Sequence, residues 1–372
     1  MKLQSSDFFL VRFADRLPGV MKLLGDFETD LLRDRLAGIE LDRPVFITGL
    51  ARSGTTILLN TFSKLPYVGT HRYRDFPFLF FPYFWNRFQS RIAKPEQPVE
   101  RAQRDRIRIT RDSPEAFEEP IWTHFFPHIH DENACHQLTA ADDQPKFDAF
   151  YSEHLRKLLL LRGGERYVSK GNYNVTRIAY IANLLPDARF VVPVRHPVAQ
   201  VDSLLRQHKL FTRYSEQDKR VPAYMRAAGH YEFGPQRVPI NLDEVQSRRI
   251  AEAWANGDDA LGYAAMWRSV YSHVGELARD HAGPGARIRI VRYEDLCADP
   301  VRILRQLFEF CGFTGGVEEM LRAPPEISAP SRRPDGLTAA EAERVWLETG
   351  DLAGSFGYQR TRFGQRTYAA AG

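Results

Sequence analysis

The sequence is poor in cysteine and has no long apolar run. Its three cysteines, Cys135, Cys297 and Cys311, are too few for a disulfide framework and lack the spacing of a metal site. The most apolar stretch, residues 76–85, is short and contains two prolines, so it cannot span a bilayer. Residues 1–36 lack the apolar core of a signal peptide or membrane anchor. These absences favour a cytoplasmic protein without a transmembrane segment.

An excess of charge of one sign is also missing. The 51 Lys and Arg residues against 47 Asp and Glu give a formal net charge of +4, which neither demands nor excludes a polyanionic partner, and we expect no nucleic-acid partner. No Gly/Ser- or Pro-rich linker divides the chain. We therefore expect a single domain over residues 1–372, with insertions at 70–160 and 211–280 that form the acceptor site. The oligomeric state stays open.

Strand patterns alternate with helix patterns along the chain. Short strand patterns occur at residues 44–48, 166–170, 188–194 and 287–291, of which the first and third are apolar enough for buried strands. Helix-start signals with a first-turn proline follow the last two of them. This alternation predicts an α/β fold of three layers with a mostly parallel central sheet and helical insertions.

A loop with two glycines joins the first strand to a helix. It spans residues 49–56 and reads Gly-Leu-Ala-Arg-Ser-Gly-Thr-Thr, a pattern whose backbone N–H groups and helix start can hold a phosphate. The Walker pattern has lysine before the final Ser or Thr, but Thr55 stands there, and the nearest cation is Arg52. A short bridging anion suits Arg52 better than a magnesium triphosphate. The loop completes the prediction of a P-loop-NTPase-like fold.

The loop and two later motifs resemble the sulfotransferases that use 3′-phosphoadenosine-5′-phosphosulfate (PAPS), notably the bacterial carbohydrate-type and tyrosylprotein branches. The later motifs are Arg195-His-Pro with Ser203 eight residues after the arginine, and the segment 292–296, Arg-Tyr-Glu-Asp-Leu. The resemblance implies transfer of the PAPS sulfonyl group to a hydroxyl or amine, without a metal. The donor-binding residues that it implies are Arg52, Ser53, Gly54, Thr55, Thr56, Arg195, Ser203 and Tyr293.

The resemblance also suggests catalytic residues. Lys170, at the end of a predicted strand, matches a family lysine near the sulfonyl group, and Arg52 would serve the leaving phosphate. The cytosolic branch has a catalytic histidine two residues after that lysine, where this chain has Asn172. Related branches use a glutamate soon after the loop helix, and in that segment Asp75 is our first choice of general base and His71 the second. The adjacent pair at 118 and 119, both glutamates, comes next.

Three further clusters have structural and functional interpretations. The first, His124, His128, His130, Cys135 and His136, fits no closed zinc pattern and is expected to be structural. The arginine run over 101–111 is typical of a solvated helix face, although an anionic glycan or lipid head group could dock there. The aromatic block at 76–85 is interpreted as core of the insertion, with an acceptor surface as the alternative.

Two other functions remain open at this point. One is a P-loop kinase acting on a small molecule, disfavoured by Thr55 in the lysine position. The other is a catalytically silent nucleotide- or glycan-binding module of the same fold. The acceptor of a sulfotransferase could be a sugar, a lipid, a peptide or a phenol, and the resemblance to the bacterial branch favours a carbohydrate or glycolipid hydroxyl.

Overall fold

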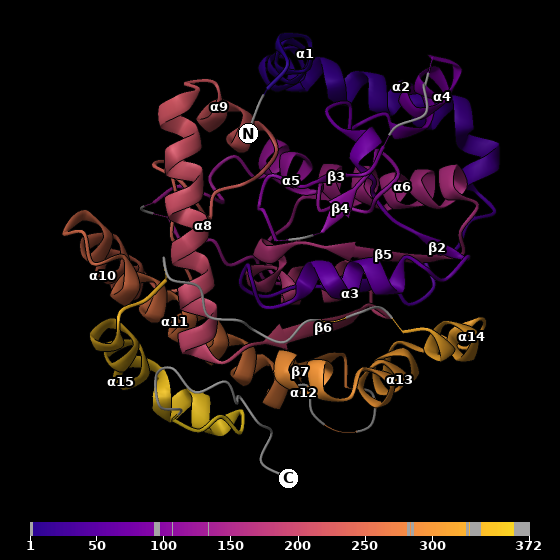
Figure 1. Ribbon diagram of the computed structural model, residues 1–372. Coiled ribbons are helices and arrows are strands. Elements are labelled where there is room, and N and C mark those ends of the chain that lie inside the picture. Colours follow the sequence, from indigo (N-terminus) through magenta and orange to yellow (C-terminus); the bar gives the residue numbers. More distant parts are fainter. Residues whose placement is uncertain are drawn as a thin grey trace.

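A five-stranded parallel sheet crosses the middle of the protein (Figure 1). The computed structural model describes residues 3–92, 97–105, 107–132, 134–280, 283, 286–324, 327 and 336–360. The strand order is β2-β5-β1-β6-β7, and every neighbouring pair is parallel. The strands are β2 (Val68–Gly69), β5 (Arg166–Lys170), β1 (Val45–Ile47), β6 (Arg189–Val194) and β7 (Ile288–Arg292). The prediction of a parallel α/β fold is confirmed.

Helices cover both faces of the sheet, so alternate strand residues enter two different cores. Val45 and Ile47 pack in one cluster with Leu58 of α3 (Thr55–Phe62) and Leu304 of α13 (Pro300–Cys311). Phe46 points to the opposite face, into the larger cluster. Burial on both faces explains why β1 and β6 are apolar runs. The result is the three-layer arrangement that the sequence predicted.

The helices outside the two insertions frame the sheet. They are α1 (Ser5–Arg16), α2 (Pro18–Leu36), α3 (Thr55–Phe62), α7 (Ile178–Leu184), α8 (Pro197–Gln217), α12 (Tyr293–Ala298), α13 (Pro300–Cys311), α14 (Val317–Arg322) and α15 (Ala339–Ser355). The proline at the start of α8 and the Asp299 side chain that caps α13 are the start signals read from the sequence. Within the described residues, no helix combines the length and apolarity needed to cross a bilayer.

The two predicted insertions, residues 70–160 and 211–280, contain the remaining strands and helices. The first range holds α4 (Pro82–Ile92), β3 (Val99–Glu100), β4 (Arg108–Ile109), α5 (Glu119–Phe125) and most of α6 (Pro145–Arg162). The second holds the end of α8 with α9 (Val221–Ala227), α10 (Glu244–Ala255) and α11 (Asp259–Asp280). A buried ion pair ties the first range to the N-terminal helices, because Lys157 of α6 lies 3.3 Å from Glu28 of α2 and both side chains are fully buried.

The arginine run over 101–111 is not a helix face, and that prediction is wrong. Strands β3 and β4 pair antiparallel and make this segment a hairpin. Arg101 points inward and is only 5% exposed, whereas Arg108 and Arg111 bond to Pro98 and Gln89. Position 106 lies outside the described residues. Periodicity failed here because two-residue strands leave almost no alternation to detect.

Candidate functional site

The loop after β1 curls through left-handed backbone before α3 begins at Thr55. Gly49, Arg52 and Gly54 have φ angles of 130°, 70° and 110°, and a non-glycine residue such as Arg52 seldom adopts such an angle without a structural reason. A Cβ on Gly54 would lie 2.5 Å from Cδ2 of Tyr293. Only glycine therefore fits between the start of α3 and that ring, which packs directly against the loop.

Arg52 is the centre of a network that joins three separate segments. Its Nε donates to Ser203 Oγ of α8 at 3.1 Å, and its Nη1 donates to Asp105 Oδ2 at 2.8 Å. Asp105 comes from the β3–β4 hairpin and also accepts from Arg101 Nε at 2.9 Å. Burial alone would raise the pKa of Asp105, but the bond and charge of Arg101 and the charge of Arg52 hold it well below its usual range. One carboxylate thus bridges two guanidinium groups.

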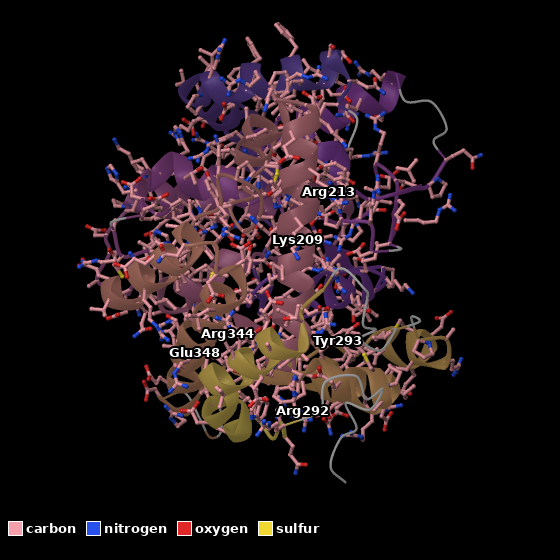
Figure 2. The ribbon with its side chains drawn as sticks, turned by 60° about the vertical axis from the view of Figure 1, so that its left-hand side comes forward. Lys209, Arg213, Arg292, Tyr293, Arg344 and Glu348 are labelled. Carbon is pink, nitrogen blue, oxygen red and sulfur yellow. The ribbon has the colours of Figure 1, made fainter. Side chains whose placement is uncertain are left out.

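Arg195 and Tyr293 lie at the other side of the loop. Arg195 Nη1 donates to the Arg52 carbonyl oxygen at 3.1 Å, and its guanidinium carbon lies 5.4 Å from the centroid of the Tyr293 ring. Tyr293 follows Arg292 where β7 ends and α12 begins (Figure 2). Because β1, β6 and β7 are parallel, their carboxyl ends meet at one edge of the sheet, where open α/β sheets bind ligands.

Among the remaining predicted loop residues, Ser53 and Thr55 are buried and Thr56 is partly exposed. Ser53 and Thr55 are 0% and 3% exposed, and Thr56 Oγ1 lies 3.4 Å from Arg101 Nη1. The structure thus brings the predicted donor-binding residues together around one loop. It adds Arg101 and Asp105, which no motif indicated.

Lys170 ends β5 and lies beside a carboxylate that sequence reasoning missed. Its Nζ is 3.5 Å from Glu115 Oε1, and the Tyr73 hydroxyl donates to Glu115 Oε2 at 2.5 Å. Arg101 Nη1 is 3.8 Å from the same carboxyl group. Burial alone would raise the pKa of Glu115, but the charges of Lys170 and Arg101 lower it to about 2.

Long-range backbone contacts explain how Glu115 reaches this position. The Glu115 N–H donates to the His71 carbonyl oxygen at 3.1 Å, and Arg72 forms an isolated antiparallel bridge with Pro114. Glu115 therefore lies next to the segment that directly follows β2. Glu115 comes 43 residues after Arg72 in the sequence, yet it lies beside the segment that contains the predicted bases Asp75 and His71.

Asp75 and His71, the predicted bases, lie in a sealed network. His71 Nδ1 is 3.1 Å from Asp75 Oδ2, and His71 Nε2 is 3.0 Å from His154 Nε2. Arg162 Nη2 donates to both Asp75 oxygens at 2.5 and 2.7 Å. Asp75 is 0% and His71 1% exposed. Burial raises the pKa of Asp75, but the His71 bond and the Arg162 charge outweigh it and lower that pKa below its usual range. These contacts favour a structural role for both.

The other carboxylates considered as bases are also committed to buried partners. Glu118 accepts from the hydroxyl groups of Tyr151 and Tyr167 at 2.9 and 2.5 Å. Glu119 accepts from Arg177 Nη1 and Nη2 at 3.0 and 2.6 Å, and His130 Nε2 is 2.5 Å from it. Among the described residues, no group of three or more His, Cys, Asp or Glu side chains could hold a metal ion.

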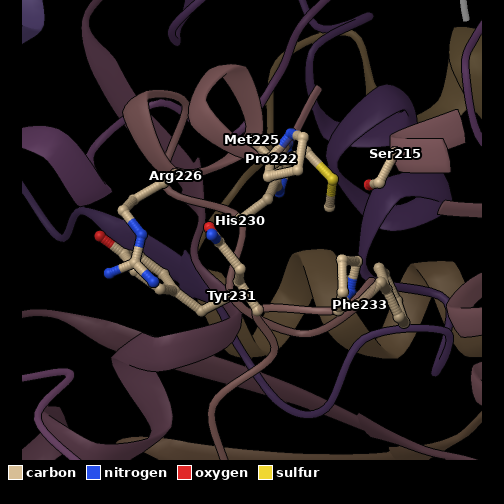
Figure 3. Close-up of a pocket in the computed structure, with 9 residues that line it drawn as sticks. Ser215, Pro222, Met225, Arg226, His230, Tyr231 and Phe233 are labelled. Carbon is tan, nitrogen blue, oxygen red and sulfur yellow. The ribbon is translucent and has the colours of Figure 1, made fainter. Parts of the chain in front are cut away.

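A second carboxylate lies on the Asn172 side of β5. Asn172 Nδ2 donates to Glu232 Oε1 at 2.6 Å, and His230 Nδ1 is 3.7 Å from Glu232 Oε2. His230 also lines a small pocket in which Arg226 lies beside Tyr231 (Figure 3). The volume of that pocket is about 10 Å³, enough for about one water molecule. It holds no sugar ring without movement of its walls.

The parallel strand order, the phosphate-type loop after the central strand β1 and the cations at the sheet edge define a P-loop-like α/β protein. The chain belongs to the sulfotransferase family, whose sequence profile matches residues 44–252, more than half of its length. The matched range contains the loop, Glu115, Lys170, Arg195 and Ser203. Family membership favours sulfonyl transfer over the kinase alternative.

Solved structures of bacterial sulfotransferases are similar to this chain. STF1 of Mycobacterium tuberculosis is 15% identical with a TM-score of 0.48, and the match covers 88% of this chain and 82% of that one. STF9 of Mycobacterium avium is 14% identical with a TM-score of 0.47, covering 87% and 81%. No curated protein sequence matches the chain.

Proposed function

We propose that the protein transfers the sulfonyl group of PAPS to an acceptor hydroxyl or amine. The observation that carries this proposal is the linkage of the 49–56 loop to two partners, Ser203 through the Arg52 side chain and Arg195 through the Arg52 carbonyl. PAPS bears anionic groups at both its 5′ and 3′ ends. The guanidinium groups of Arg52 and Arg195 belong to two residues joined by the 3.1 Å bond from Arg195 Nη1 to the Arg52 carbonyl oxygen, and both are placed to bind such a nucleotide, one at each end.

The proposed roles at the donor follow from position. The loop N–H groups, Thr55, Thr56 and Arg52 bind the 5′-phosphate, which is the leaving group, while Arg195 and Ser203 bind the 3′-phosphate. Tyr293 packs against Gly54 and under Arg195, where its ring can support the nucleotide.

Glu115 replaces Asp75 and His71 as the proposed general base. The acceptor oxygen forms a bond to sulfur as the bond from sulfur to the 5′-phosphate oxygen breaks, and the acceptor proton passes to Glu115. Lys170 neutralises the sulfonyl oxygens. The sulfonyl group draws Lys170 away from Glu115 and adds negative charge nearby. Both effects raise the pKa of Glu115 from about 2 and make it a stronger base.

A carbohydrate or glycolipid hydroxyl is the proposed acceptor class, bound by residues 70–160 and 211–280 in a single domain. Aromatic side chains of these ranges lie near Glu115: Phe76 stacks on Phe117 with centroids 5.1 Å apart, and its edge meets Tyr224 at 5.8 Å. Rings of this kind offer apolar faces to a sugar while Glu115 and Tyr73 offer polar atoms. We place the reaction in the cytoplasm, which agrees with the three free thiols.

Calorimetry and a transfer assay test the proposal together. Adenosine 3′,5′-bisphosphate, the product left by PAPS, should bind without Mg²⁺ and more tightly than ATP does with Mg²⁺. Radiolabelled sulfonyl should then pass from PAPS to at least one member of a panel of glycans, glycolipids and phenols. Bisphosphate binding without transfer would indicate the silent binding module. Preference for ATP with Mg²⁺ would contradict the proposal and support a kinase.

A further inference from the structure

Exposed apolar side chains gather on one side of the molecule. Helices α1, α2 and α4 lie together at the end opposite α13 and α15 (Figure 1). Of the thirteen large apolar side chains exposed among the described residues, nine belong to these helices and a tenth, Leu17, joins α1 to α2. They are Phe9, Phe13, Leu17, Val20, Leu23, Leu24, Phe27, Leu31, Phe84 and Phe88, and we call them the apolar face. Exposed apolar side chains concentrated on neighbouring helices indicate an interaction surface.

The spacing shows that the apolar face is a separate stripe of α2 from the one that packs. Val20, Leu24, Phe27 and Leu31 recur every three or four residues, which aligns them along one side of a helix. The buried residues of α2 form another stripe: Met21, Gly25, Glu28, Leu32 and Leu36. A Cβ on Gly25 would lie 2.6 Å from the Phe80 carbonyl oxygen, so that side of α2 packs closely on the insertion. The exposed stripe of α2 therefore takes no part in the packing of the core.

Arginines lie directly beside the apolar face. A groove of about 470 Å³ between α2 and α4 is lined by Leu32, Arg35, Tyr83, Phe84, Arg87, Phe88 and Arg91. Arg35 and Arg87 both donate to the Tyr83 hydroxyl, at 2.5 and 3.0 Å, which fixes two guanidinium groups around one ring. Among the residues that the structure describes, no acid lines this groove.

A neighbouring groove continues the positive charge. It measures about 200 Å³, shares Arg87 with the first groove and is lined also by Arg72, Arg74 and Arg162. Its lining again contains no acid, although Asp112 pairs with Arg72 and Arg74 from outside it and Asp75 pairs with Arg162. Apolar side chains therefore border a continuous arginine-rich strip.

We propose that the apolar face and its arginines dock the protein on an anionic lipid surface. Phenylalanine and leucine side chains of α1, α2 and α4 would enter the boundary between head groups and acyl chains, as in interfacial amphipathic helices. Arg35, Arg87 and Arg91 would bind lipid phosphates and carboxylates, and each basic residue near such a surface adds to the affinity. Binding of this kind needs no helix that crosses the bilayer.

Charge favours a lipid surface over a second copy of the chain. A twofold contact through this face would bring arginine-lined grooves toward their own equivalents, and like charges brought together oppose association. Two acids of α2 that could neutralise the arginines already have partners: Asp26 pairs with Lys22 at 2.6 Å and Asp30 with Arg33 at 2.6 Å. An anionic bilayer supplies the opposite charge across the whole strip.

Vesicle sedimentation with the full chain tests this proposal independently of catalysis. The protein should sediment with vesicles of phosphatidylcholine and phosphatidylserine, less with phosphatidylcholine alone, and the difference should shrink at high salt. Phe27→Ser with Leu31→Ser, and separately Arg87→Glu with Arg91→Glu, should each weaken binding roughly tenfold or more. Leu347→Ser on α15, which is 72% exposed, and Arg302→Glu on α13 are matched controls that should bind as the parent does.

The opposing outcomes are equally clear. Because the substituted side chains are exposed, unfolding temperatures should stay close to that of the parent chain, and sedimentation equilibrium should report its mass as one chain. Failure to bind the anionic vesicles, or loss of binding in the control variants to the same extent, would overturn the proposal. A dimer that Phe27→Ser with Leu31→Ser converts to monomer would overturn it as well and assign the face to self-association.

Discussion

Arg52 at the centre of the phosphate-type loop is paired with Asp105 from the β3–β4 hairpin, with 2.8 Å between Nη1 and Oδ2. The pair is 18% and 12% exposed, and Arg101 binds the same carboxylate. A donor phosphate that reaches Arg52 meets this carboxylate at the same guanidinium. The hairpin therefore sets part of the free energy of donor binding.

The first prediction concerns that carboxylate. Asp105→Asn should bind adenosine 3′,5′-bisphosphate several-fold more tightly, because it removes a negative charge that repels the ligand. The free protein should lose stability, since two largely buried guanidinium groups lose their counter-charge. Titration calorimetry and thermal unfolding with and without the bisphosphate measure both effects. Weaker binding would instead show that Asp105 orients Arg52 for the donor.

Arg52 and Arg195 should differ in what their loss affects. Arg52→Ala should lower kcat by about a hundredfold or more, because Arg52 serves charge that develops on the leaving phosphate. Arg195→Ala should mainly raise the KM for PAPS and the Kd for the bisphosphate. Steady-state kinetics with PAPS varied at a fixed acceptor separates the two. Equal effects on kcat and KM in both variants would contradict the division of roles.

Glu115→Gln should remove the proposed base while it keeps the shape of the site. We expect kcat to fall about a hundredfold or more, with little change in bisphosphate affinity. Glu232→Gln is the matched comparison, since Glu232 is the other buried carboxylate at the end of β5 and contacts Asn172. Single-turnover transfer rates decide between them. If Glu232→Gln is the slower variant, Glu232 becomes the base.

The pH dependence gives an independent test of Glu115. Its pKa of about 2 means that the carboxylate of the free enzyme is ionised throughout the neutral range, so its protonation should produce no acidic limb between about pH 5 and 8 in kcat/KM for PAPS, which reports the free enzyme. A histidine base would produce a limb near its ordinary pKa of about 6.5. Rates at limiting PAPS across this range distinguish the two. An acidic limb that persists in Glu232→Gln and vanishes in a histidine variant would exclude Glu115.

Glu119→Gln should chiefly lower the free energy of unfolding. It leaves Arg177, which is 1% exposed, without its counter-charge, at a cost of about 3–5 kcal/mol in the free energy of unfolding. Burial raises the pKa of Glu119, but Arg177 and His130 outweigh burial and lower it to about 2. The stabilisation is therefore complete above the unfolded pKa of about 4.5 and is lost as the pH falls toward 2. Urea unfolding at neutral pH measures the loss, with Glu318→Gln in the exposed Arg305 pair as a control expected to leave stability almost unchanged.

The sheet was predictable because its signals are local. Strands β1 and β6 are buried on both faces, so each reads as an apolar run, and the first-turn proline of a helix follows β6. The loop with Gly49 and Gly54 is likewise a short pattern in which backbone geometry dictates residue type. Fold class and loop position follow from these features alone.

The proposed general base, Glu115, could not be found from local sequence patterns. Glu115 reaches the site through a backbone bond to His71 and a bridge between Arg72 and Pro114, contacts that no periodicity or spacing encodes. Asp75 had the expected place after β2, but burial beside Arg162 commits it to an ion pair that sequence alone does not reveal. Position along the chain indicated Asp75, whereas the contacts in the structure favour Glu115, which lies beside Lys170.

Lys157 links the N-terminal helix α2 to the core, so the fold depends on that helix. Its ammonium group is held by Glu28 and by the carbonyl oxygens of Gly25 and Phe80, at 3.0 and 3.2 Å, inside the core. Cutting away α2 would remove two of the three partners of this cation, so a shortened chain that begins at β1 should misfold. The contacts of Lys157 to Glu28 and Gly25 transmit any tilt of α2 to α6, which packs on β2. A lipid surface that orients α2 would thereby also orient the edge of the sheet that carries the proposed site.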